Sequence, residues 1–341
     1  MSDTTSDLVP GKTADNAANS VPTDDVEVSF VFPTRNRREI VRRLLTYLRT
    51  LSGPKHEVIV IDDASTDGTW AMIRQDFPEV RGFRNETQSA QERLQHAVEM
   101  AKGRFIFELD DDSWPAEDTL QKVMAHFEAR GSALGLVALP IHDAKTGRLG
   151  YTSYFPKLSP GELYAPTYGY RGPGVVFRRD ALGEVPISPP GYFSGGFETV
   201  TVIELRRRGW EADFLADAPV YHLWVGRPRT IRPDTAFYPF RNDLVTFRRY
   251  YRGWQRSEMM IGRLLVGLVH LSAAGRPQDF PRAVREANRM FAERGVSAVS
   301  QETRRLAYPC FDGVTLKTLF SETNLRRVAW KLGFIPIDQT C

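Results

Sequence analysis

The feature that most constrains the fold of this sequence is an alternation of short apolar runs with helix-period segments between residues 26 and 139. Two of the runs, "VSFVF" and "EVIVI", hold the branched and aromatic side chains that are typical of strands covered on both faces. Between them, "REIVRRLLTYLRTL" repeats apolar residues at helical spacing, with arginines on the opposite side. Strands that alternate with helices predict an α/β fold, in which a mostly parallel, twisted sheet carries helices on both faces.

The remaining pattern divides the chain into regions. Strands are expected in "VRGFRN", "RFIFEL", "LGLVAL", "GVVFRR" and "EADFLADAPVYH". A helix is expected to begin near Glu198 and to stop at Gly209, and from about Asp234 onward the pattern is mostly helical. We therefore predict the following parts: a disordered tail (1–25), a domain (26–225) with two halves (26–139 and 140–225), and a basic, mostly helical region (226–341).

The cysteines, the first 25 residues and the longest apolar stretch indicate the cellular compartment of the protein. The two cysteines are Cys310 and the last residue, Cys341, which argues against a disulfide framework. The polar first 25 residues do not resemble a secretory signal. The longest apolar stretch, "MMIGRLLVGLVHLSAAG", carries Arg263 and His270 and is shorter than the roughly 20 residues that span a bilayer. We therefore expect a cytoplasmic protein.

The formal net charge of +3 is unevenly distributed. From residue 226 to the end there are 20 Lys/Arg against 10 Asp/Glu, which leaves 25 against 32 in the preceding part. A basic C-terminal third suggests attraction to an anionic partner, and the inner face of a membrane or a phosphorylated substrate would both serve. The alternative is a solvated helical surface, which is the usual meaning of a charge run. We expect no nucleic-acid partner.

Polar clusters follow three of the predicted strands. They are "PTRN" after the first strand, "DDASTDGT" after the second and "DDDSWP" after the fourth. In open parallel sheets, ligands bind outside the carboxyl ends of the strands, where these loops emerge. The three clusters together therefore predict a ligand site at this edge of the sheet.

The third cluster contains three consecutive aspartates, Asp110, Asp111 and Asp112. Adjacent carboxylates repel one another, and burial would raise their pKa values unless a cation compensates. Divalent Mg²⁺ or Mn²⁺ prefers carboxylate oxygens. In an extended segment Asp110 and Asp112 project to the same side, so they can share one metal ion. The alternative is that Asp112 or Ser113 caps the helix expected after Pro115.

The order of these motifs resembles the family 2 glycosyltransferases of the GT-A fold, which transfer a sugar from a nucleotide diphosphate sugar with inversion at the anomeric carbon. The resemblance rests on the following stretches: "VFPTRNR", "VIVIDDASTDGT", "FIFELDDDSWP", "GPGVVFRRDAL", "FETVTVIELRRRGW" and "PVYH". It covers about residues 26–222, with a looser echo in "FYPFRNDLVTF". It implies that residues 26–225 form the catalytic domain, with a nucleotide-binding half and an acceptor-binding half.

The resemblance implies a nucleotide-sugar site built from the loops after the first two strands. Thr34 would lie near the nucleoside, Asp63 would hold the base or the ribose, and Asp62 would support the turn. Ser65, Asp67 and Gly68 are turn formers, so "DDASTDGT" also fits an Asx turn that leads into a helix.

The resemblance also implies a metal site at the aspartates. Asp110 and Asp112 would be the family's DxD pair, with Asp112 the more direct metal ligand and Asp110 nearer the ribose; Asp111 is counted with the nucleotide-sugar contacts. Arg93 stands near a position where relatives often have an arginine that contacts nucleotide or phosphate. His222, at the end of "APVYH", stands where relatives place a histidine near the metal, and a structural role is equally open.

Inverting transfer needs a general base, which the family supplies from an acidic pair at the start of the late helix. The second member of the pair falls on Glu198, and Phe197 replaces the first. The preceding "GGF" is loop-like, so we expect it to expose the Glu198 carboxylate. The alternative is that Glu198 merely lies in the first turn of the helix, where a negative charge is favourable.

Four further residues stand in motifs of the resemblance. Gly172 and Gly174 would let the backbone approach the sugar or the acceptor, or would form a plain turn. Arg241 and Asn242 would touch the acceptor or, as we prefer, would pack the C-terminal helices onto the catalytic sheet.

The sequence therefore predicts a glycosyltransferase that depends on Mn²⁺ or Mg²⁺. Its partners would be a nucleotide diphosphate sugar and an acceptor that is a saccharide, a lipid-linked molecule or a small molecule. A sugar nucleotidyltransferase is disfavoured, because "VFPTRNRREI" lacks the glycine-rich loop of that class. A nonenzymatic nucleotide-sugar binding protein stays open, because Phe197 replaces an acidic residue.

Overall fold

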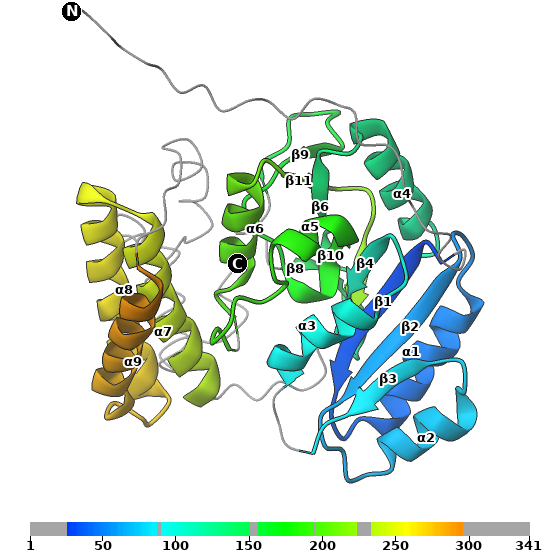
Figure 1. The fold of residues 1–341 in the computed structure, drawn as a ribbon, viewed down its shortest axis with the longest axis horizontal. Coiled ribbons are helices and arrows are strands. Elements are labelled where there is room, and N and C mark those ends of the chain that lie inside the picture. The colour runs from blue at the N-terminus through cyan, green and yellow to red at the C-terminus, as the bar shows by residue number, and fades with distance from the viewer. Residues whose placement is uncertain (1–25, 87–89, 151–155, 194, 224–232, 296–341) are drawn as a thin grey trace, which may run out of the picture.

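A computed structural model describes residues 26–86, 90–150, 156–193, 195–223 and 233–295 of this chain. Its central layer is an eight-stranded sheet in the order β3-β2-β1-β4-β10-β6-β11-β9 (Figure 1). The strands of this sheet are β1 (Val28–Thr34), β2 (His56–Asp62), β3 (Arg81–Arg84), β4 (Phe105–Glu108), β6 (Leu134–Ala138), β9 (Tyr164–Pro166), β10 (Val175–Arg178) and β11 (Glu211–Leu215). The expected α/β architecture is confirmed.

The direction of the strands differs from the expectation in one half of the sheet. Strands β1 to β4 pair in parallel, as do β6 and β11, whereas β10 runs antiparallel to both β4 and β6, and β9 runs antiparallel to β11. A parallel neighbour requires a crossover that returns the chain to the opposite end of the sheet. No described α-helix lies between β6 and β10 to make that crossover, so β10 is reversed, whereas β1, β2, β3, β4, β6 and β11 share one direction and the sheet is mostly parallel as expected.

A second, four-stranded sheet in the order β5-β12-β7-β8 lies beside the carboxyl end of β4. Its strands are β5 (Ser113–Pro115), β7 (Ile141–Asp143), β8 (Leu149–Gly150) and β12 (Val220–His222). Strand β5 pairs antiparallel with β12, so the chain directly after the three aspartates is held against the end of "PVYH". This pairing positions the candidate metal site.

Helices cover both faces of the central sheet. They are α1 (Arg38–Thr50), α2 (Thr69–Asp76), α3 (Ala90–Met100), α4 (Thr119–Arg130), α5 (Arg179–Glu184) and α6 (Glu198–Arg207). Alternation along β1 divides its side chains between the two faces: Phe30 and Phe32 pack in the core with α1, α2 and α4, and Val31 packs in the core with α3, α5 and α6 (Figure 1). Both expected layers are therefore present.

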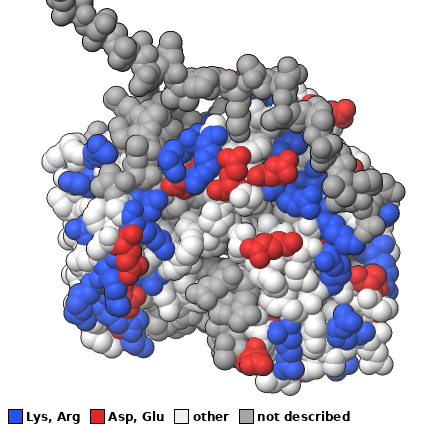
Figure 2. Space-filling view, viewed as in Figure 1, with Lys and Arg blue, Asp and Glu red and all other residues white. Residues whose placement is uncertain are grey.

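The C-terminal helices are α7 (Pro233–Tyr250), α8 (Gly253–Ala273) and α9 (Asp279–Arg294), and they form a bundle beside α6 (Figure 1). Phe197 and Val200 of the α6 region share a buried core with Phe240 and Phe247 of α7. Lys and Arg side chains gather over this bundle at the left of Figure 2. None of the described helices is both long enough and apolar enough to cross a bilayer.

Arg241 and Asn242 of α7 take the packing role that the sequence favours. The Arg241 guanidinium donates to Gly191 O at 2.6 Å, and Asn242 Nδ2 donates to Phe193 O at 3.0 Å and to Gly195 O at 2.8 Å. These contacts fix the loop that precedes α6. The expected tail (1–25) and residues 296–341 lie outside the described part of the chain.

Candidate functional site

The three aspartates lie in the short connection between β4 and β5. Asp111 and Asp112 form a turn rather than the extended segment that was expected. The next helix, α4, begins only at Thr119 with Asp118 as its N-cap residue, so neither Asp112 nor Ser113 caps it. The capping alternative for the aspartates is therefore wrong. The strand β5 intervenes because Ser113–Pro115 pairs with β12.

The pairing of β5 with β12 brings His222 to the aspartates. Ser113 lies opposite His222 in the register, and Leu223 N donates to Asp112 O at 2.8 Å. The Ser113 hydroxyl accepts from Asp110 N at 2.9 Å and so closes the turn from within. The sequence suggested Ser113 only as a helix cap, but its hydroxyl group stabilises the conformation of this loop.

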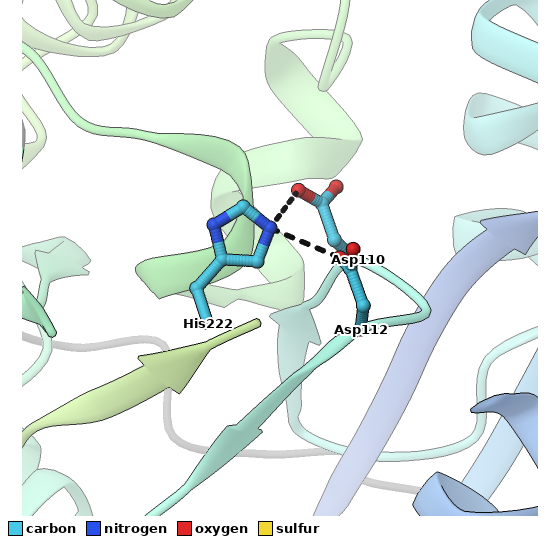
Figure 3. Close-up of side chains that lie close together, drawn as sticks. All are labelled: Asp110, Asp112 and His222. Carbon is cyan, nitrogen blue, oxygen red and sulfur yellow. Dashed lines mark hydrogen bonds and ion pairs between the residues drawn. The ribbon is translucent and has the colours of Figure 1, made fainter. Parts of the chain in front are cut away.

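Asp110, Asp112 and His222 converge (Figure 3). His222 Nε2 lies 2.9 Å from Asp112 Oδ1 and 3.5 Å from Asp110 Oδ2, and one ligand atom from each of the three residues lies within 4.8 Å of the others. His222 is 1% exposed, whereas the Asp110 side chain is 43% exposed. Burial alone would raise the pKa of Asp112, but hydrogen bonds from His222 and Arg37 outweigh it and hold that pKa below its usual value. Two carboxylates and an imidazole form a donor set suited to a divalent ion such as Mn²⁺.

Asp111 points to a different partner. Its Oδ2 accepts a hydrogen bond from the Thr34 hydroxyl at 2.7 Å, and both residues are buried. Burial raises the pKa of Asp111 to about 7, against the opposing effects of Arg37 and Thr34. Thr34 and Asp111, both expected near the nucleotide, are thus hydrogen-bonded to each other. This bond joins the end of β1 to the turn that contains Asp110, Asp111 and Asp112, called the acidic turn below.

Arg37 is a charged member of this site that the sequence analysis did not single out. It follows "PTRN" after β1, and its Nη1 lies 2.7 Å from Asp112 Oδ2 and 3.4 Å from Asp111 Oδ1. Its side chain is 41% exposed, so it can also meet a bound ligand. The sequence feature that could have identified Arg37 is the position of "TRNR" at the carboxyl end of the first strand. A cation there would face the aspartates at the end of the fourth strand.

The loop after β2 holds Asp62 and Asp63. Asp62 is fully buried and its Oδ2 accepts from Ser65 N at 3.2 Å, which is the supporting role expected for it. Asp63 is half-buried, its N donates to Thr34 O at 2.8 Å, and its Oδ1 accepts from Asn85 Nδ2 at 3.1 Å. Ala64 follows with a φ of +59°, a left-handed conformation that costs free energy in residues other than glycine.

The adjacent loop after β1 is strained in the same way. Asn36 has a φ of +51°, and its Oδ1 accepts from Thr66 N at 2.7 Å, while its own N donates to Ser65 Oγ at 2.9 Å. The two loops therefore hold each other in place at the edge of the sheet. Asp67 accepts from Thr69 N at 3.0 Å, which is the expected Asx turn at the start of α2.

Glu198 is the first residue of α6, but its carboxylate is not exposed as expected. Only 6% of the residue is accessible, and Arg171 Nη1 donates to its Oε1 at 3.1 Å. Asp243 of α7, buried nearby, has a pKa raised to about 6, mainly by burial and further by the charge of Glu198. The glutamate is thus held by an arginine in a largely dry setting.

Glu108 is an acidic residue that lies near both Glu198 and Asp110, and the sequence analysis did not single it out. It is the last residue of β4 and is buried. Burial, followed by the charges of Asp110 and Glu198, raises its pKa well above the usual value. Glu198 and Asp110 are therefore both close enough to act on one carboxyl group. The signal in the sequence was an acidic residue inside the apolar run "FIFEL".

The glycines of "RGPGVVF" form a 3₁₀ turn, Gly172–Gly174, rather than an open approach for ligand. A Cβ on Gly174 would lie 2.9 Å from Ile141 Cγ1, and one on Gly172 would lie 3.0 Å from Glu108 Oε1. Close packing against the second sheet and Glu108 therefore accounts for both. Arg93 falls within α3, but its side chain lies outside the described residues.

A cavity of about 310 Å³ adjoins the acidic turn. Its lining includes the charged residues Arg43, Asp111 and Asp112, together with Tyr47, Trp114 and Leu223. A small organic group could therefore lie directly beside the carboxylates.

Residues 29–185 match the profile described as "Glycosyl transferase family 2". TuaG of Bacillus subtilis, named as a teichuronic acid biosynthesis glycosyltransferase, is 30% identical over 112 residues, which is 31% of this chain and 44% of TuaG. Glycosyltransferase AglE of Haloferax volcanii is 25% identical over 178 residues, or 50% of this chain and 58% of AglE. The chain thus spans about half the length of these relatives.

Solved structures share the fold at low sequence identity. The structure of S. aureus TarS 1-349 in complex with UDP-GlcNAc has a TM-score of 0.55 and 16% identity, with 82% of this chain and 84% of that chain covered. The mannosyltransferase PcManGT from Pyrobaculum calidifontis, in complex with GDP-Man and Mn²⁺, has a TM-score of 0.54 and 18% identity, with 88% and 89% covered. Residues 29–185 are therefore similar to family 2 glycosyltransferases, and the chain shares the fold of these solved structures.

Proposed function

We propose that this protein is a metal-dependent inverting glycosyltransferase, which moves a sugar from a nucleotide diphosphate sugar to an acceptor hydroxyl. The observation that carries the proposal is the convergence of Asp110, Asp112 and His222 beside Arg37, near a buried glutamate held by an arginine. Arg37, the two aspartates and His222 come from three separate segments of the chain, so no one local motif accounts for their meeting.

Asp110, Asp112 and His222 are the residues that would hold the metal ion. Their donor set fits Mn²⁺ well, and Mg²⁺ less well because of the imidazole. When bound, a divalent ion supplies positive charge that stabilises a departing diphosphate. Mn²⁺ in the complex of PcManGT supports this assignment.

The donor would lie over the carboxyl ends of β1, β2 and β4. Asp63 and Thr34 border this edge from two loops whose backbones are interlocked. Arg37, 41% exposed, would donate hydrogen bonds to phosphate oxygens. UDP-GlcNAc in TarS and GDP-Man in PcManGT are donors of the class we propose.

Glu198 would be the general base. Its carboxylate would accept the proton of the acceptor hydroxyl while the acceptor oxygen bonds to the anomeric carbon and the bond from that carbon to the diphosphate oxygen breaks. Arg171, at 3.1 Å, would orient the carboxylate. A buried carboxylate near the reacting atoms is desolvated, which suits proton abstraction in a water-poor site.

Replacement of Glu198 by Gln tests this role. We expect donor affinity to persist and kcat to fall by about 10²- to 10⁴-fold, since the amide cannot accept the proton. Glu128→Gln, at an exposed position of α4, is the matched control. Release of nucleoside diphosphate from a panel of UDP-, GDP- and dTDP-sugars would be measured with and without Mn²⁺. Unchanged turnover in the Glu198 variant, or full activity in EDTA, would contradict the proposal.

We further propose that α8 contacts an anionic membrane surface, which would favour a lipid-linked acceptor over a soluble saccharide or small molecule. An apolar stripe on α8 is solvent-exposed: Trp254 is 72%, Ile261 45%, Leu265 45% and Leu268 47% accessible. Glu258, the one acidic residue of α8, is buried, and the exposed Arg252 and Arg256 flank the start of the stripe. Apolar side chains beside arginines are the combination that binds an anionic interface.

Co-sedimentation with vesicles tests this contact. At low salt the protein is expected to pellet with phosphatidylglycerol-containing vesicles and not with pure phosphatidylcholine. The double variant Trp254→Ser, Leu265→Ser should stay in the supernatant. Leu149→Ser, at an equally exposed leucine on β8, should pellet like the parent protein. Equal binding of the parent and the double variant would exclude α8 as the contact.

A further inference from the structure

A second cavity, of about 240 Å³, lies apart from the acidic turn, where the connection between α5 and α6 meets α7 and α9. Its apolar lining includes Val185, Pro186 and Val200. Its polar lining consists of these residues: Tyr192, Glu204, Arg208, Arg249, Tyr250 and Arg294. Three guanidinium groups therefore face the cavity against a single carboxylate.

Glu204 neutralises only part of this positive charge. Its Oε2 accepts from Arg208 Nη1 at 2.6 Å and from Arg207 Nε at 3.0 Å, and its Oε1 accepts from the Tyr250 hydroxyl at 2.6 Å. Burial alone would raise the pKa of Glu204, but these hydrogen bonds outweigh it and hold that pKa below its usual value. The Glu204 carboxylate therefore already accepts three hydrogen bonds. Its single negative charge does not balance the positive charges of the arginines that line the cavity.

Arg249 has a donor that Glu204 does not satisfy. Its Nη2 is 3.7 Å from Glu204 Oε1, and its buried Nε finds no hydrogen-bond acceptor among the residues that the structure describes. A buried donor without an acceptor costs about 1–3 kcal/mol. Arg294 approaches from α9, where its guanidinium lies 5.5 Å from the centroid of the Tyr192 ring and its Nη2 donates to Pro190 O. A ligand with acceptor oxygens would satisfy Arg249 Nε and would meet the remaining N–H groups of Arg294.

We propose that this cavity binds a phosphate group, with Arg208, Arg249 and Arg294 as its donors. Guanidinium groups pair with phosphate through two parallel hydrogen bonds, and the surplus positive charge favours a dianion over a monoanion. At about 240 Å³ the cavity is smaller than most sites for drug-sized ligands, so it admits a phosphate with a short organic group and not a whole nucleotide sugar. The apolar wall favours an ester over orthophosphate.

The site shares its elements with the candidate base. Glu204 lies six positions after Glu198 on α6, or about 9 Å along the helix axis. Pro189 and Tyr192 of the cavity belong to the loop that leads to Glu198, and Arg241 anchors that loop at Gly191. A phosphate bound here therefore lies within reach of an acceptor that extends from Glu198, and it would also steady the loop before that residue.

The test is a titration with inorganic phosphate in EDTA, which removes any phosphate binding that depends on metal at Asp110 and Asp112. Calorimetry and thermal shift would follow the folded full-length protein, since ligand binding raises apparent stability by mass action. We expect saturable binding that is at least fivefold weaker in Arg249→Gln and in Arg294→Gln. Arg289→Gln, an exposed arginine of α9 outside the cavity, should bind as the parent does.

Glu204→Gln separates a binding site from a purely structural arginine cluster. Removal of the competing carboxylate should tighten phosphate binding several-fold, even where it lowers the melting temperature. Tighter binding of glycerol 3-phosphate than of orthophosphate identifies an ester as the ligand, and equal binding identifies free phosphate. The absence of saturable binding, or the same affinity in the parent and in all of the arginine variants, overturns the proposal. Because the assay needs no metal and no donor, its failure leaves the proposed transfer reaction unaffected.

Discussion

The ion pairs of Arg130 offer a sharp test of how burial sets the strength of electrostatic interactions in this fold. Arg130 at the end of α4 contacts two acidic residues of β11: its Nε lies 2.8 Å from Asp213 Oδ2, and its Nη2 lies 2.8 Å from Glu211 Oε2. The Asp213 side chain is 1% exposed and that of Glu211 is 45% exposed. One strand thus presents a buried and an exposed partner to the same arginine at the same distance.

Asp213 has an additional partner, since His126 Nε2 lies 3.0 Å from its Oδ2. The variant Asp213→Asn keeps the shape of the side chain and removes the charge. Loss of one charged hydrogen bond costs about 1.5–3 kcal/mol. Breaking a fully buried pair costs about 3–5 kcal/mol, and Arg130 is itself 31% exposed, so we expect a loss of about 3 kcal/mol in the free energy of unfolding. Glu211→Gln should lose less than about 1 kcal/mol, as exposed pairs do.

The pH dependence of the same variant has a defined sign. Burial alone would raise the pKa of Asp213, but hydrogen bonds from His126 and Arg130 outweigh it and hold the pKa below its usual value. A carboxyl group with a lowered pKa in the folded state stabilises the protein above its unfolded pKa of about 3.9, and this contribution is lost as the pH falls through the folded pKa. The difference between parent and Asp213→Asn should therefore shrink as the pH falls below about pH 4.

Urea unfolding, followed by circular dichroism at several pH values, measures both effects. Equal losses for Asp213→Asn and Glu211→Gln would refute the reasoning, because burial would then make no difference at a common partner and distance. A difference that grows as the pH falls would refute the assigned direction of the pKa.

Two further predictions concern the site itself. His222→Asn should weaken Mn²⁺ binding at least tenfold by calorimetry, whereas His142→Asn on the neighbouring strand β7 should not; a loss of thermal stability with unchanged Mn²⁺ affinity would make His222 purely structural. Gly174→Ala should lower stability by about 1–3 kcal/mol in urea unfolding, because its Cβ would lie 2.9 Å from Ile141 Cγ1 and 3.1 Å from Leu139 O. Gly183→Ala in α5 meets no atom within 4 Å and should be neutral or stabilising, so a matching loss there would contradict the packing argument.

The elements of the fold were predictable where local periodicity decides them. Strands β1 and β2 and helix α1 appear where the apolar runs and the helical stripe placed them, because both faces of the sheet are covered. The direction of β10 was not predictable in this way. It depends on the absence of a crossover helix after β6, and residues 140–174 gave no periodic signal that settled the path of the chain.

The site was predictable in its composition and less so in its geometry. The positions of Asp63 and the aspartates at strand ends followed from the topology of a parallel sheet. The contact of His222 with Asp112 depends on the pairing of β5 with β12 across 110 residues, which no local pattern encodes. The burial of Glu198 was mispredicted for a related reason, since the neighbouring Phe197 and Val200 pack against α7, far along the chain.

The three adjacent aspartates are tolerable because the turn assigns each to a different environment. Asp111 points inward to the Thr34 hydroxyl, and burial raises its pKa to about 7. Asp112 meets Arg37 and His222, and Asp110 remains the most exposed of the three. An extended strand would have placed Asp110 and Asp112 on one side without these partners. The turn therefore reduces the repulsion within the triplet and leaves two carboxylates directed at one point, which is the arrangement that a divalent cation requires.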